Sequence, residues 1–128
     1  MDHWIAKDGV NLDVLRPELA RLELVIAGAY EEWNACAVVT CTDGDHKGRR
    51  SYHNPPWCAA LDLRIHHIGN TEQQMFFYTS LKRAVDNAWP GLYDVLLESP
   101  GKENAHIHIE CSPILAMVMF GSPTIQEA

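Results

Sequence analysis

The stretch Ala105-His106-Ile107-His108-Ile109-Glu110-Cys111 decides the fold, because apolar and polar residues alternate along it without a break. A period of two is typical of a β-strand with one buried face and one open face. The two isoleucines are therefore expected to face a hydrophobic core. The polar residues share the opposite face of the strand: His106, His108 and Glu110.

Three more strands are expected around this one. Residues 92–98 precede it and pair with it as a hairpin, since residues 99–104 are rich in turn formers. Residues 59–65 alternate in the same way, with Asp62 and Arg64 on the open side. The β-rich run Val38-Val39-Thr40 predicts a strand at residues 35–41.

The first expected helix covers residues 17–33, where apolar side chains recur at steps of three or four. Pro17 suits the first helical turn, because its missing N–H has no partner there, and Asn34 is expected to end the helix. The predicted apolar stripe consists of Leu15, Leu19, Leu22, Ile26, Tyr30 and Trp33.

The second expected helix covers residues 72–89. Thr71 with Gln74 three residues on predicts a capping box at its start, and Pro90-Gly91 stops it. The predicted apolar stripe consists of Met75, Tyr78, Leu81 or Lys82, Val85 and Trp89.

The order helix, strand, strand, helix, strand, strand predicts an α+β fold. We expect a small antiparallel sheet with helices packed on one face and the polar site on the open face. A chain of 128 residues predicts a single domain. In the tail, residues 113–128, the apolar run 114–120 fits a further strand, a segment packed on the core or a contact with another chain.

Composition excludes several function classes. The formal charge of −7 argues against nucleic acid as a partner, because phosphate binding depends on Lys and Arg. The longest apolar run is too short for a bilayer, and the N-terminus lacks the pattern of a secretory signal, so we expect a cytoplasmic product without membrane contact. The four cysteines contain no C-x-x-C pair and are expected to be reduced and buried.

A metal site is predicted from two separated motifs. His53 is followed nine residues later by Asp62, and the later strand carries His106 and His108. Zinc binds imidazole nitrogen and carboxylate oxygen, and catalytic zinc sites use three protein ligands with a fourth position for water. Two other interpretations are a half-exposed polar strand and the H-x-H metal motif of rolling-circle replication nucleases. The acidic charge, and the absence of a tyrosine after Tyr93, disfavour the nuclease.

These motifs resemble the zinc D-Ala-D-Ala peptidases, whose superfamily includes the lysostaphin-type peptidases and the hedgehog signalling domain. The first half of the resemblance is Ser51-Tyr52-His53 followed by Ala60-Leu61-Asp62-Leu63-Arg64, and the second is Tyr93 to Glu98 followed by His106-Ile107-His108-Ile109-Glu110. It covers about residues 12–113 and is closest to small phage-encoded members. The spacing from His53 to Asp62 is nine residues, where the family normally has seven.

The resemblance implies one zinc ion held by His53, Asp62 and His108. It makes His106 a partner histidine that orients substrate or stabilises the transition state, and it places Ser51 in the substrate cleft. The family's catalytic acid stands three residues before the zinc histidine. That position is Ala105 for His108 and Glu103 for His106, so the choice between the two histidines stays open.

Glu103 is the first candidate for the general base, with Glu98 and Glu110 in reserve. Arg50 or its neighbour Arg49 is expected to pair with a substrate carboxylate. The resemblance implies a peptidoglycan hydrolase, either a D,D-carboxypeptidase or an endopeptidase resembling a phage endolysin, delivered to the cell wall by another component. The alternative is a non-catalytic zinc-binding or virion-assembly protein on the same fold. The oligomeric state stays open.

Overall fold

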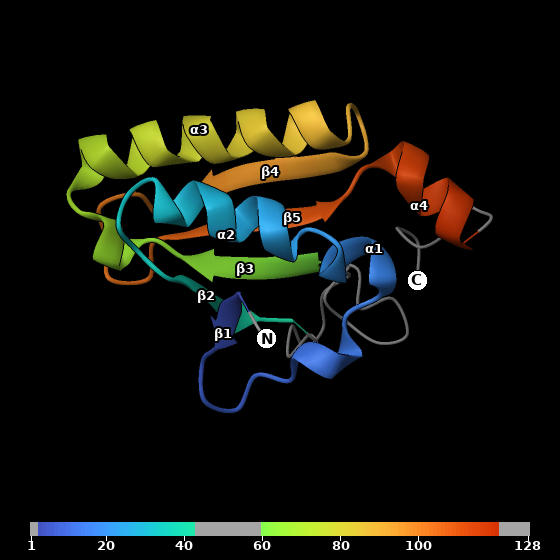
Figure 1. Cartoon of the computed structure of the whole chain (residues 1–128), viewed down its shortest axis with the longest axis horizontal. Helices are drawn as coiled ribbons and strands as arrows, with labels where there is room; N and C mark the ends of the chain where they lie inside the picture. Colours follow the sequence, from blue (N-terminus) through green and yellow to red (C-terminus); the bar gives the residue numbers. More distant parts are fainter. Residues whose placement is uncertain (1–2, 43–59, 121–128) are drawn as a thin grey trace.

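The computed structural model describes residues 3–42 and 60–120, and within them five strands form one sheet in the order β1-β2-β3-β5-β4 (Figure 1). Helices α2 and α3 lie over one face of this sheet. The strands are β1 (Trp4–Ala6), β2 (Ala37–Cys41), β3 (Ala60–Arg64), β4 (Tyr93–Glu98) and β5 (His106–Cys111). The helices are α1 (Pro17–Ala20), α2 (Glu23–Glu31), α3 (Thr71–Ala88) and α4 (Pro113–Phe120), with 3-10 turns at Leu12–Val14 and His66–Ile68.

The α+β class is confirmed, but the sheet is mixed rather than antiparallel. The pairs β2–β3, β3–β5 and β4–β5 are antiparallel, whereas β1 runs parallel to β2, with Trp4 opposite Ala37. β1 is absent from the elements expected from the sequence because three residues are too few to show a period of two. The strand is held at the sheet edge by Trp4, which is only 4 % exposed.

The core lies between the sheet and the helices, as the alternation in β5 predicts. Ile107 and Ile109 are fully buried, and so are Leu61 and Leu63 opposite them on β3. Burying a large aliphatic side chain stabilises the fold by about 1.5–3 kcal/mol. The strongest burial therefore lies directly beneath the open face that carries the histidines.

The predicted first helix is divided into α1 and α2, with a turn at Arg21 and Leu22 between them. The amide of Leu22 donates to the carbonyl of Leu19, which tightens the backbone there to a 3-10 turn. Asn34 ends this region in a left-handed conformation with φ 55°, as expected of a helix-ending Asn. The predicted stripe from Leu15 to Tyr30 is nevertheless buried, so the break does not change the helical face that packs.

The start and the register of α3 differ from the sequence prediction. Asn70, not Thr71, is the cap: its Oδ1 accepts from the amide of Gln73 at 2.9 Å, and Gln73 Oε1 accepts from the amide of Asn70 at 2.8 Å. The buried side chains of the helix are Gln74, Phe77, Leu81 and Val85, whereas Met75 is 52 % exposed. Four large residues in a row from position 75 leave the period ambiguous, and packing against α2 selects Phe77.

The apolar tail forms α4, which begins after Ser112; the Ser112 Oγ accepts from the amide of Leu115 at 3.3 Å. Leu115 and Ala116 are buried against the core, so the expectation of a packed segment is met in part. Ile114, Met117 and Val118 are exposed. Among the described residues, no helix combines the length and the apolar character needed to cross a bilayer.

The described cysteines differ in burial: Cys111 is buried, Cys41 is partly buried and Cys36 is exposed. Cys111 is fully buried, and burial raises the pKa of its thiol to about 12. Cys36 is exposed and precedes β2 instead of lying within it, so the expectation that all four are buried is wrong there. Cys58 lies outside the described residues.

Candidate functional site

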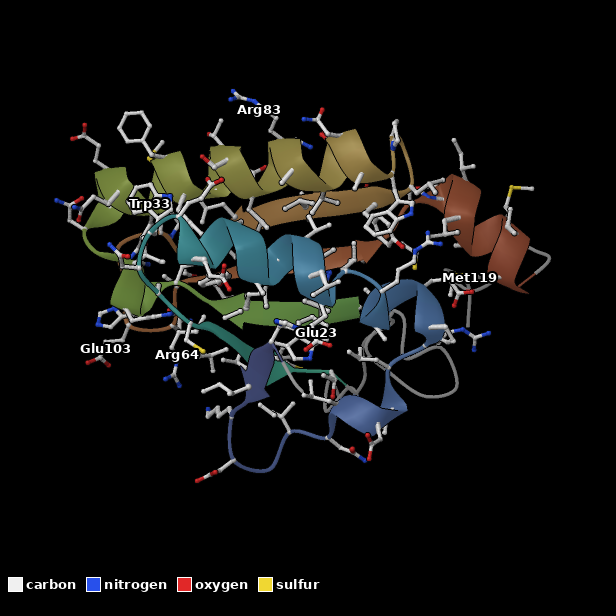
Figure 2. All side chains as sticks on the ribbon, viewed as in Figure 1. Glu23, Trp33, Arg64, Arg83, Glu103 and Met119 are labelled. Carbon is white, nitrogen blue, oxygen red and sulfur yellow. The ribbon has the colours of Figure 1, made fainter. Side chains whose placement is uncertain are left out.

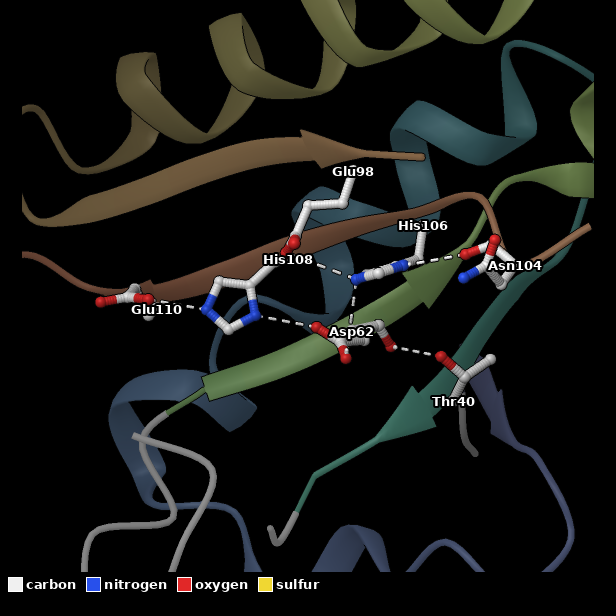
Figure 3. A network of polar contacts seen from close by, with 7 residues as sticks. All are labelled: Thr40, Asp62, Glu98, Asn104, His106, His108 and Glu110. Atoms are coloured by element: carbon white, nitrogen blue, oxygen red, sulfur yellow. Dashed lines mark hydrogen bonds and ion pairs between the residues drawn. The ribbon is translucent and has the colours of Figure 1, made fainter. Parts of the chain in front are cut away.

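The candidate site lies on the open face of the sheet, over β3 and β5. The register places Asp62 opposite His108 and Arg64 opposite His106. On the other side of β5, Glu98 of β4 stands opposite His106. Directly opposed residues in a sheet have Cβ atoms about 4.5–5.5 Å apart, so strand pairing alone brings the side chains of Asp62, His106, His108 and Glu98 close together (Figure 3).

His108 lies between two carboxylates. Its Nδ1 is 2.9 Å from Asp62 Oδ1, and its Nε2 is 2.7 Å from Glu110 Oε1. The side chains of His108 and Asp62 are each only 13 % exposed. Solvent screening is weak at such burial, so these contacts hold the imidazole in one orientation.

His106 is oriented differently. Its Nδ1 is 2.9 Å from the carbonyl oxygen of Asn104, and a carbonyl only accepts, so Nδ1 carries the proton. The other nitrogen, Nε2, lies 3.4 Å from Glu98 Oε1 and 3.9 Å from Asp62 Oδ2. The two oxygens of Asp62 therefore face the two histidines, which makes Asp62 the centre of the network.

The acidic side of this network lies on β4. Asp94 stands opposite Glu110, and burial raises the pKa of Asp94, with the charge of Glu110 as the next contribution. Two carboxylates close together disfavour double ionisation, so this part of the face favours a cation.

Strand β2, which lies next to β3, contains a β-bulge beside the site. Val39 pairs with Leu63 and Cys41 pairs with Asp62, so Thr40 is an extra residue in β2. Its hydroxyl lies 3.5 Å from the carbonyl oxygen of Asp62. Bulges occur beside binding sites because they redirect a side chain and increase the local twist. This one contributes Thr40 to the wall of a cleft.

That cleft has a volume of about 400 Å³. Asp62 and His106 line it together with Lys7 after β1, Thr40 and Cys41 of β2, Arg64 of β3, and Glu103, Asn104 and Ala105 of the β4–β5 turn. Figure 2 shows Glu103 and Arg64 at the same end of the molecule. The volume lies in the range of small-molecule sites, about 300–1,000 Å³.

The turn that carries Glu103 is tied to α3 by one buried side chain. Gln74 is 1 % exposed; its Oε1 accepts from the amide of Gly101 at 2.8 Å, and its Nε2 donates to the carbonyl of Gly69 at 2.9 Å. Gly101 has φ +81°, and a Cβ there would lie 2.2 Å from Thr71 Oγ1, so only glycine fits. The position of the turn therefore depends on the register of α3.

Replacing Gln74 with Leu is expected to destabilise the protein by about 1–3 kcal/mol and to release the turn, because two buried backbone groups lose their partners. Urea unfolding measures the first effect, and hydrogen exchange at the Gly101 amide measures the second. Met75→Leu, one position on and half exposed, serves as the control. Unchanged exchange at Gly101 in Gln74→Leu would show that the turn is held by other contacts.

The structure brings together Asp62, His106 and His108 as predicted, and it places Glu103 at the cleft. Glu98 contacts His106, and Glu110 contacts His108. Lys7 and Thr40 were not predicted as part of the site, and no sequence pattern links them to the histidine motif. The predicted residues Arg50, Ser51 and His53 lie outside the described residues.

The donor atoms of Asp62 and His108 lie at a separation close to that of two zinc ligands. Two zinc ligands at about 2.0–2.1 Å in tetrahedral geometry lie roughly 3.3 Å apart. The 2.9 Å between His108 Nδ1 and Asp62 Oδ1 is a few tenths shorter, so this pair fits two corners of a site after a small opening. Within residues 3–42 and 60–120, no group of three or more His, Cys, Asp or Glu is arranged to hold a metal. A third protein ligand would come from elsewhere.

The comparisons with known proteins give no match from which a role of the site could be inferred. No protein-family model matches the chain, and neither does any curated protein or solved structure.

Proposed function

We propose that this protein is a zinc-dependent peptidase that hydrolyses a peptide bond of bacterial peptidoglycan. One observation carries the proposal: Asp62, His106 and His108 converge from two strands on one open face, and a cleft lies beside them. The resemblance of the two motifs to zinc D-Ala-D-Ala peptidases supports the same conclusion.

In this proposal Asp62 and His108 hold the zinc ion, and His53 is the third protein ligand. Bound zinc supplies Lewis acidity and lowers the pKa of water in such sites. Glu110, at 2.7 Å from His108 Nε2, is a further carboxylate beside the site. Carboxylates that contact a metal-binding histidine orient its ring and increase its basicity.

The chain's other groups would handle protons and orientation. Glu103 lines the cleft and is exposed, so it can take a proton from the attacking water and return it to the leaving amine. His106 has its Nδ1 engaged by Asn104, which directs Nε2 toward Asp62 and Glu98. In the proposal His106 donates from Nε2–H to the reacting carbonyl oxygen in its doubly protonated form, because Nε2 without a proton only accepts.

A non-catalytic assembly protein is the second candidate function. Its supporting observation is α4, where Ile114, Met117 and Val118 are 65 %, 53 % and 78 % exposed. Neighbouring exposed apolar side chains are typical of protein contacts. This candidate predicts that the open-face residues can be replaced without loss of function.

The Glu103→Gln variant tests the enzyme proposal. Loss of a general base typically lowers the rate by about 10²–10⁴-fold, so we expect that fall in kcat on a peptidoglycan stem peptide. Glu98→Gln and Glu110→Gln are compared in the same assay, and Glu32→Gln, exposed at the end of α2, is the control. Release of peptide is measured by mass spectrometry, with and without a zinc chelator. If the wild type releases nothing in the presence of zinc, the assembly candidate is favoured.

A further inference from the structure

Two cationic side chains line the cleft, one from the residue after β1 and one from β3. Lys7 follows β1, and its amide donates to the carbonyl of Val39 at 2.9 Å. Arg64 is the last residue of β3, and its carbonyl accepts from the hydroxyl of the fully buried Tyr30 at 2.7 Å. The backbone at both positions is therefore fixed by the fold, and the two side chains line one cleft.

Neither Lys7 nor Arg64 forms an ion pair with a described residue, although carboxylates also line the cleft. The Asp62 oxygens face His106 and His108, and Glu103 is not within salt-bridge distance of either cation. The described lining of the cleft carries two cations, Lys7 and Arg64, and two carboxylates, Asp62 and Glu103, so it is less acidic than the chain as a whole, whose net charge is −7.

The size and arrangement of the cleft indicate what these cations bind. A cleft of about 400 Å³ is at the small end of the range for ligand sites, which suits the end of a short peptide better than an extended chain. Asp62 and His106 line the same cleft as Lys7 and Arg64. Arg64 stands opposite His106 in the register of β3 and β5, so an anion held by Arg64 would lie next to His106.

We propose that Lys7 and Arg64 form a carboxylate-binding subsite that holds the free C-terminus of a short peptide. This inference rests on the proposed peptidase function and narrows it to a carboxypeptidase. The Arg64 guanidinium provides the planar pair of donors that matches a carboxylate, and Lys7 adds a point charge. Lys7 and Arg64 are thereby added to Arg50, which lies outside the described residues, as candidates for binding a substrate carboxylate.

Three matched peptides test the subsite in the zinc-loaded full chain. The first peptide ends in a free carboxylate, and the second ends in an amide. The third has a free C-terminus, but the carboxylate of an acidic side chain within the peptide is converted to an amide. We expect kcat/KM to fall about tenfold or more for the C-terminal amide only, the scale of one lost charge-assisted hydrogen bond. In Arg64→Gln and Lys7→Gln that discrimination should shrink, whereas it should persist in Arg83→Gln, whose side chain lies on the outer side of α3 (Figure 2).

A binding measurement separates failure of the subsite from failure of the enzyme. Acetyl-alanine and its amide are titrated into the full chain as purified, and the Arg64 Nε–H and Ala105 amide signals are followed by NMR. Binding of the acid, weakened in Arg64→Gln, supports the subsite even if no peptide is cut. Equal cleavage of the acid and amide peptides, unchanged in Arg64→Gln, overturns the subsite and leaves the peptidase intact. If the rate falls only when the acidic side chain of the peptide is amidated, the subsite does not bind the C-terminal carboxylate and the assignment is overturned.

Discussion

Replacing Asp62 with alanine is expected to remove bound zinc and to lower hydrolysis by more than about 100-fold. The reason is its central position: its two oxygens face His108 at 2.9 Å and His106 at 3.9 Å. Residues that only orient a metal ligand typically change affinity or activity by about 10–100-fold, and a ligand should exceed that range. Metal content is measured by mass spectrometry on the wild type, Asp62→Ala and His108→Ala.

The control is Asp13→Ala, an exposed aspartate in the 3-10 turn near the N-terminus, which should keep about one zinc per chain. Circular dichroism of each variant separates metal loss from unfolding. If the wild type holds no zinc and takes none up when it is added, Asp62 and His108 are a polar pair without a metal. The assembly candidate then replaces the peptidase.

Phe77→Ala is expected to have the largest effect on stability, about 3–5 kcal/mol, the usual cost of truncating a buried Phe. Phe77 is fully buried, with its ring 4.5 Å from that of Tyr30 and 6.0 Å from that of Trp33. Its loss removes the aromatic contact between α3 and α2. The free energy of unfolding is measured in urea at neutral pH.

The matched control for this prediction is the preceding residue. Phe76 is 61 % exposed, so Phe76→Ala should change the free energy of unfolding by less than about 0.5 kcal/mol. The pair differs only by one position along the helix. Equal costs would mean that α3 packs in another register, and a reversed order would support the register in which Met75 faces the core.

The α3 register also determines the site, through Gln74. A one-residue rotation that buried Met75 would move Gln74 away from the Gly101 amide. The turn that carries Glu103 would then lose this contact with α3. The capping box at Asn70 and Gln73 sets this register locally, and Phe77 sets it through packing. Stability on the helical face and chemistry on the open face are therefore linked by a single helix.

The sequence by itself determined which residues share a face of each central strand. Alternation in β5 and β3 assigned Ile107 and Ile109 to the core and the histidines and Asp62 to the open side, because side chains in a strand must alternate. The α+β class followed from the order of helices and strands. These conclusions depend on local geometry alone.

Only the tertiary structure decided how those faces meet. Pairing of β3 with β5 sets Asp62 beside His108, and a parallel strand too short to recognise in the sequence brings Lys7 to the cleft. The register of α3 was likewise undecided within a run of large apolar residues, until packing against Tyr30 selected Phe77. Contacts between residues far apart in the chain decide these features, and a period along the sequence carries no information about which partner lies opposite.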